Sequence, residues 1–121
     1  MKKVISVFVM ALVACTLFAS PIQLGSFPIG QWLDHNYDAV WDFASNNIRI
    51  LSPDGKVIYD FSARTVQDFN VLLEGLRPGI SFSCPEAERS YRFITTIPSS
   101  DLVLEIERKD LPKYSVTMKK Q

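Results

Sequence analysis

The feature that most limits how this chain folds is an alternation of apolar and polar residues in short runs, each closed by a turn signal. In residues 37–43, tyrosine, alanine, tryptophan and phenylalanine alternate with aspartate and valine. The same alternation returns in residues 57–61, 80–84, 91–97, 102–106 and 114–118, and SPDGK at 52–56 carries the Asp-Gly pair of a tight hairpin. An alternation with a period of two is typical of strands that bury one face. The pattern predicts an all-β chain of short antiparallel strands.

One segment, residues 65–74 (TVQDFNVLLE), supports two interpretations. Thr65 and Asp68 have the spacing of a helix capping box, and Gly75 is suited to the end of a helix. The alternation instead places residues 67, 69, 71 and 73 on one face of a strand. Because the neighbouring runs are strands and the connections are short enough for a meander, we expect a strand here.

The number and spacing of the runs indicate how the strands are arranged. Counting the lead-in through Trp32, the chain holds about eight or nine strands, spaced by the roughly 8–12 residues that are usual in β-sandwiches and β-barrels. Sequential hairpins favour an up-and-down order, and closing the sheet removes exposed edges. We therefore expect a single-domain antiparallel up-and-down β-barrel of about eight strands over residues 30–121, after an extended lead-in at 21–29.

The first twenty residues, MKKVISVFVMALVACTLFAS, have the composition of a bacterial signal peptide. Two lysines precede an apolar stretch that is too short to span a bilayer, and small residues follow it. Leu-Val-Ala-Cys, ending at Cys15, resembles the lipobox at which a lipoprotein cysteine is lipidated, whereas residues 17–19 suit ordinary signal peptidase. We expect an exported protein that is periplasmic, secreted or lipid-anchored, with both processing routes open.

Charge and cysteines exclude several classes of partner. Without residues 1–20 the chain keeps 11 of its 13 basic residues and all 13 acidic ones. This balance offers no basic surface for nucleic acid or for anionic lipid. Contact with a membrane is therefore expected only through a lipid on Cys15. Cys84 then has no intramolecular partner, so we expect no internal disulfide.

Residues that carry chemistry are few. His35 is the only histidine, and neither His35 nor Cys84 lies in a recognisable catalytic motif. Asp34, Asn36 and Asp38 have the spacing of the first calcium ligands of an EF-hand, but the later glycine and glutamate are absent. We expect a polar turn rather than a metal loop, no cofactor and no enzymatic activity.

Gly30-Gln31-Trp32 resembles the Gly-x-Trp sequence at the start of the first barrel strand in lipocalins and related calycins. The resemblance implies a cup-shaped barrel that holds a small apolar ligand. It also implies that the tryptophan closes one end of the barrel beside a basic residue of a late strand, for which Arg108 and Lys109 are candidates. The mature chain is shorter than a usual lipocalin, and it lacks the disulfides and the C-terminal helix common in that family.

The aromatic residues are the candidates for ligand binding. We expect a non-enzymatic protein that binds a small hydrophobic or amphipathic ligand through large side chains on the inward face. The candidate residues are Trp32, Trp41, Phe43, Tyr59, Phe61, Phe82, Phe93 and Tyr114. The alternative is a filled barrel that binds another envelope protein through loops such as LRPG (76–79) and CPEAER (84–89). Arg49, Arg89 and Arg92 are expected on the outer face, which strand parity supports for Arg49 and Arg92, whereas an arginine turned inward could bind a carboxylate head group.

Overall fold

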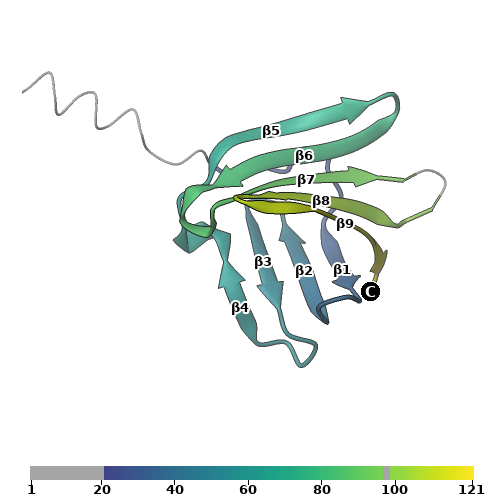
Figure 1. Cartoon of the computed structure of the whole chain (residues 1–121). Coiled ribbons are helices and arrows are strands. Elements are labelled where there is room, and N and C mark those ends of the chain that lie inside the picture. Colours follow the sequence, from purple (N-terminus) through teal and green to yellow (C-terminus); the bar gives the residue numbers. More distant parts are fainter. Residues whose placement is uncertain (1–20, 97–98) are drawn as a thin grey trace, which may run out of the picture.

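The computed structural model describes residues 21–96 and 99–121, which form one antiparallel sheet with two short 3-10 helices (Figure 1). The predicted signal peptide, with Cys15, lies outside the described residues. The strands are β1 (Gly30–Asp34), β2 (Ala39–Ala44), β3 (Asn47–Leu51), β4 (Val57–Asp60), β5 (Gln67–Glu74), β6 (Arg77–Cys84), β7 (Arg89–Thr95), β8 (Leu102–Arg108) and β9 (Leu111–Lys120). The helices are η1 (Phe61–Ala63), between β4 and β5, and η2 (Pro85–Ala87), between β6 and β7. In the part of the chain so described, no helix has the length and apolar character to cross a membrane.

The nine strands follow an up-and-down order with one open seam. Their order in the sheet is β4-β3-β2-β1-β9-β8-β7-β6-β5, so every strand pairs with its neighbour in the sequence except β4 and β5. The first and last strands pair with each other through Trp32 with Lys120 and Leu33 with Lys119. Figure 1 shows the sheet curled on itself, with β1–β4 facing β5–β9. The predicted all-β, single-domain, up-and-down antiparallel fold is confirmed, and its form is a half-barrel of nine strands.

The open seam between β4 and β5 has a local cause in the segment that joins them. Asp60 caps η1 by accepting a hydrogen bond of 2.9 Å from the backbone N–H of Ser62. The 3-10 turn takes the chain away from the β4 edge, and Phe61 enters the core within it rather than at the end of a strand. β4 and β5 therefore become the two edges of the sheet.

Aromatic side chains fill the core between the two halves. The Trp41 ring lies 5.0 Å from Phe93 and 5.8 Å from Phe61, measured between centroids, and Phe43 lies 5.1 Å from Phe93. The lead-in contributes to this core as well, because Leu24 is buried and its N–H donates to the carbonyl oxygen of Ser45 at 3.1 Å. Residues 21–29 are thus part of the packed domain.

Trp32 closes the sheet where β1 meets β9. Its indole N–H donates to the carbonyl oxygen of Ser100 at 2.9 Å, and the ammonium of Lys120 lies 5.5 Å from the ring centre. The resemblance to calycins proposed Arg108 or Lys109 for this position, and that expectation is wrong. The β1–β9 register places Lys120 opposite Trp32, whereas Arg108 ends β8 and lies 5.9 Å from the ring of Tyr114.

β5 is a strand, as expected, but its predicted alternation is interrupted. The pairing with β6 shifts between Gln67 and Asn70, where Asp68 has a φ of 55°. The irregularity changes which residues face inward, so Val71 and Leu73 are exposed on the edge strand. The prediction that residues 67, 69, 71 and 73 share one face of the strand therefore fails at the irregularity.

Candidate ligand-binding site

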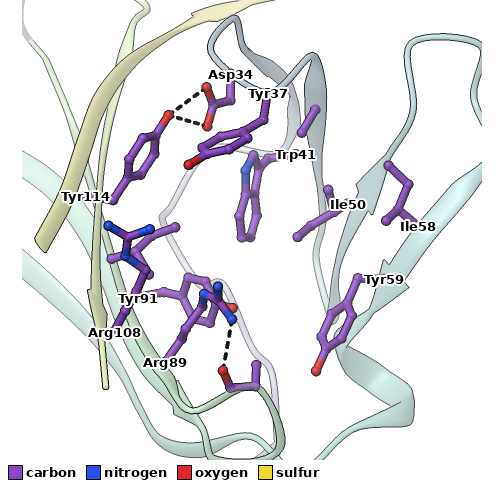
Figure 2. A pocket seen from close by; sticks show the side chains of 13 residues that line it. Asp34, Tyr37, Trp41, Ile50, Ile58, Tyr59, Arg89, Tyr91, Arg108 and Tyr114 are labelled. Atoms are coloured by element: carbon purple, nitrogen blue, oxygen red, sulfur yellow. Dashed lines mark hydrogen bonds between the residues drawn. The ribbon is translucent and has the colours of Figure 1, made fainter. Parts of the chain in front are cut away.

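A cavity of about 300 Å³ lies between the two halves of the half-barrel (Figure 2). Its walls come from β1–β4 on one side and from η2, β7, β8 and β9 on the other. Tyr37 and Ile58 at its margin are exposed, so the cavity opens to solvent there. The lining residues are Asp34, Tyr37, Ala39, Trp41, Ile50, Ile58, Tyr59, Ala87, Arg89, Tyr91, Ile106, Arg108 and Tyr114.

The strand alternation explains why these residues meet. Ala39 and Trp41 are two residues apart on β2 and therefore point to the same face, and the same holds for Ile106 and Arg108 on β8. The alanine leaves space beside the indole, because it has no side chain beyond Cβ. The centre of the cavity is thus an apolar surface with polar groups at its ends.

One polar end of the cavity is built on a buried carboxylate. Asp34 is only 2% exposed, although it is the last residue of β1 and a polar turn follows it. The hydroxyl of Tyr114 lies 2.9 Å from both Asp34 carboxylate oxygens, contacts that are drawn as dashed lines in Figure 2. The backbone N–H of Asn36 donates to Oδ1 at 2.9 Å. The Asn36 side-chain amide donates in turn to the Tyr114 hydroxyl at 3.0 Å. Burial, together with the hydrogen bond to Asp34, raises the pKa of Tyr114 to about 12.

Two further tyrosines form the opposite part of the wall. The Tyr59 hydroxyl lies 3.5 Å from the sulfur of Cys84, and the Arg64 guanidinium lies 4.8 Å from the Tyr59 ring centre. Burial is the largest cause that raises the pKa of Tyr59 to about 12, and the hydrogen bond to Cys84 adds to it. Burial also raises the pKa of Tyr91. All three phenols therefore stay neutral at physiological pH and act as hydrogen-bonding groups.

Two arginines stand at the end of the cavity where β7 begins and β8 ends. Arg89 and Arg108 are direct cross-strand partners. Arg89 Nη1 donates to the carbonyl oxygen of Ala87 at 3.0 Å, a bond drawn in Figure 2. Arg108 donates to the carbonyl oxygen of Pro112 through Nε at 3.1 Å and Nη2 at 2.7 Å. These backbone bonds hold both guanidinium groups at the cavity wall.

The predicted ligand-binding residues divide into two groups. Trp41, Tyr59 and Tyr114 line the cavity. The other five candidates do not line it and are buried in the aromatic core, namely Trp32, Phe43, Phe61, Phe82 and Phe93. The alternation identified the inward face correctly. It does not show whether an inward side chain packs in the core or lines the cavity, because that depends on the residues opposite it.

Arg89 and Arg108 were not among the predicted binding residues, although the strand parity points to them. Arg89 is two residues before the inward-facing Tyr91, and Arg108 is two residues after Ile106. The outer-face prediction is therefore wrong for Arg89, which lines the cavity. It holds for the other two arginines it named: Arg49 lies 2.8 Å from Asp42, and Arg92 forms ion pairs with Glu105, at 3.2 Å, and with Glu74. Strand parity, applied to charged as well as apolar residues, would have assigned Arg89 and Arg108 to the inner face and Arg49 and Arg92 to the outer face.

The remaining reactive residues are not brought together. His35 is exposed in the turn after β1, whereas Cys84 is fully buried at the end of β6. The described residues contain no group of three or more histidine, cysteine, aspartate or glutamate side chains arranged to hold a metal ion. Asp34, the first residue of the EF-hand-like spacing, directs both carboxylate oxygens to Tyr114.

Comparisons with protein-family models, with curated proteins and with solved structures found no match to this chain. The resemblance to lipocalins and calycins therefore rests on Gly30-Gln31-Trp32 and on a sheet compatible with a barrel. Evidence for a function comes from the cavity and the residues that line it.

Proposed function

We propose that the protein binds a small apolar or amphipathic molecule in the cavity and performs no chemistry on it. The observation that carries this proposal is an aromatic and aliphatic cavity, open at Tyr37 and Ile58, inside a half-barrel. Ligand sites are concave, largely apolar and supplied with a few placed polar groups, which describes this cavity. Its volume of about 300 Å³ lies at the lower end of the usual range for such sites, so the ligand is small, such as one alkyl chain.

The position of the two tryptophans gives a direct test. Trp41 lines the cavity, whereas Trp32 is buried at the β1–β9 contact. Titration with a hydrophobic fluorophore is expected to quench or shift the emission of a Trp32→Phe variant, whose tryptophan is Trp41. The Trp41→Phe variant is expected to respond much less. An equal response of both variants, or of neither, would place binding outside the cavity.

A second test fills the cavity by enlarging one of its lining side chains. Ala39→Phe places a ring beside Trp41, and Ala44→Phe is the matched control because Ala44 ends the same strand and is exposed. Each methylene-sized contact in a hydrophobic pocket is worth about 1–3 kcal/mol, so losing one or more weakens binding by about tenfold or more. If both variants bind the fluorophore as the native protein does, the cavity is not the site. Native mass spectrometry of protein from its own cells would identify a retained ligand.

A second candidate function, binding to another envelope protein, is favoured by the β5–β6 hairpin. Leu76 at its tip is 84% exposed, and Val71 and Leu73 are exposed on the β5 edge. An edge strand with exposed apolar residues is suited to pairing with an extended segment of a partner. A photo-reactive amino acid in place of Leu76 is expected to form one adduct of defined mass in cells, while the same change at Leu111 forms none. Equal labelling at both positions would count against a specific partner.

We further propose that the domain is exported, on the evidence of the sequence of residues 1–20. The mass of the mature protein identifies the processing route, and Cys15→Ser is expected to release a lipoprotein from membranes. Unchanged partition and unchanged mature mass in this variant would identify ordinary signal peptidase cleavage. A mature protein that keeps Met1 would refute export by either route.

A further inference from the structure

The arginine pair at the end of the cavity is an unusual arrangement for a sheet. Arg89 and Arg108 face each other directly across β7 and β8, and both line the cavity. Like charges directly opposite each other on neighbouring strands destabilise a sheet. The hydrogen bonds from Arg89 to Ala87 and from Arg108 to Pro112 hold both cations in place but do not neutralise them.

Elsewhere in the described chain, most basic side chains on the strands have acidic partners. Arg49 pairs with Asp42, Arg92 with Glu105, and Lys119 with Asp101. Across residues 21–96 and 99–121, neither arginine of the cavity forms a salt bridge. The nearby Glu88 pairs with Lys109 at 3.5 Å. An anion supplied by a ligand would therefore be the acidic partner of this pair.

The cavity also has a polarity that would orient such a ligand. Asp34 carries the acidic group of the lining and lies beyond Tyr114, which separates it from Arg108 in Figure 2. The apolar surface between the two polar ends contains Trp41 and Ile50. An anionic group is thus attracted to the arginine end and repelled from the Asp34 end.

We propose that the ligand is an anionic amphiphile whose oxyanion head group is held between Arg89 and Arg108, with its alkyl chain against Trp41 and Ile50. Planar guanidinium groups bind carboxylate and phosphate oxygens through paired, charge-assisted hydrogen bonds. The proposal rests on the proposed function, because it names the class of ligand for the same cavity.

The test compares three probes that share a ten-carbon chain: decanoate, decyl phosphate and 1-decanol. Affinity is measured by Trp41 fluorescence in the Trp32→Phe protein and by calorimetry, at neutral pH and below the concentrations at which the probes form micelles. At this pH the carboxylate is ionised, since an ordinary carboxyl group has a pKa near 4. At least one anion is expected to bind about tenfold or more tightly than the alcohol, because hydrogen bonds to charged groups are about twice as strong as neutral ones.

Variants assign the difference to the two arginines. Arg89→Gln and Arg108→Gln are each expected to weaken anion binding about tenfold and to leave decanol binding within about twofold. Arg108→Lys keeps the charge but not the planar paired donors, so it is expected to keep part of the anion preference, and Arg89→Gln remains the test if Arg108→Gln fails to fold. Arg92→Gln is the matched control on the outer face of β7 and is expected to change neither affinity. The anion affinities are also expected to fall with rising salt.

The outcomes separate this inference from the proposed function. If all three probes bind with equal affinity, the cavity binds apolar chains and the anion proposal is overturned. If the anions bind more tightly but Arg89→Gln and Arg108→Gln leave that preference unchanged, the assigned head-group site is wrong. If no probe binds, the proposed function itself fails. A preference for decanoate over decyl phosphate, or the reverse, identifies the oxyanion.

Discussion

Removing the hydroxyl of Tyr114 should expose the cost of burying Asp34. The hydroxyl carries a single proton, so its 2.9 Å distances to both Asp34 oxygens describe one hydrogen bond shared between them. Tyr114→Phe removes that donor and leaves the carboxylate with the backbone N–H of Asn36. A hydrogen bond to a charged group contributes about 1.5–3 kcal/mol, so we expect the free energy of unfolding to fall by about 2 kcal/mol.

Urea denaturation followed by tryptophan fluorescence measures this change. With a slope of about 1–3 kcal/mol per molar urea, the midpoint is expected to fall by about 1 M. Tyr37→Phe is the control, because the Tyr37 ring lies 5.2 Å from Tyr114 but is 64% exposed. It should stay within about 0.5 kcal/mol of the native protein. In a double-mutant cycle, Tyr114→Phe should cost little once Asp34→Ala has removed the acceptor; a loss as large as in the native background would refute the reasoning.

Three further predictions follow from other parts of the structure. A Cβ at Gly79 would lie 2.6 Å from the carbonyl oxygen of Phe93, so Gly79→Ala should destabilise the fold by about 1–3 kcal/mol. The same urea assay measures this change, and an unchanged midpoint would show that β6 and β7 can move apart to make room for the methyl group. Burial raises the pKa of Tyr59 and Tyr114 from 10.0 to about 12, so the unfolded chain releases these protons first. The contribution of these two phenols to stability should therefore be constant below pH 10 and fall as the pH rises from 10 to 12, as measured by urea midpoints and tyrosinate absorbance. The thiol of Cys84 is fully buried, so a thiol reagent should label it far more slowly in the native protein than in urea, and equal rates would contradict that burial.

The strands were predictable because the signal for them is local. Alternation over five or six residues placed Trp41 and Phe93 on the inner face, where both are buried. The burial of Asp34 was not predictable in this way, because its partner Tyr114 lies 80 residues away and only the β1–β9 contact brings them together. The irregularity at Asp68 was equally hidden, since a single residue with positive φ leaves no periodic signal.

The same limit applies to the site. Parity could have assigned Arg89 and Arg108 to the inner face, but it could not show that the two face each other, which depends on the register of β7 and β8. Nor could it distinguish Trp41, which lines the cavity, from Phe93, which fills the core on the same side of the sheet. Cavities form where large side chains fail to meet, and that depends on pairs of residues distant in sequence.

The place of β9 in the sheet has a consequence for how the protein acquires its structure. β9 is the ninth strand in order of synthesis, yet it lies at the centre, paired with β8 on one side and with β1 on the other. Before it is made, β1–β4 and β5–β8 are two separate meanders with no backbone hydrogen bonds between them to hold the sheet together. The contact of Trp32 with Lys120 closes most of the chain into one loop, and such non-local contacts slow folding. The nascent chain therefore stays incompletely folded until residues 111–120 are available, and a shortened chain that lacks them loses the connection between its halves.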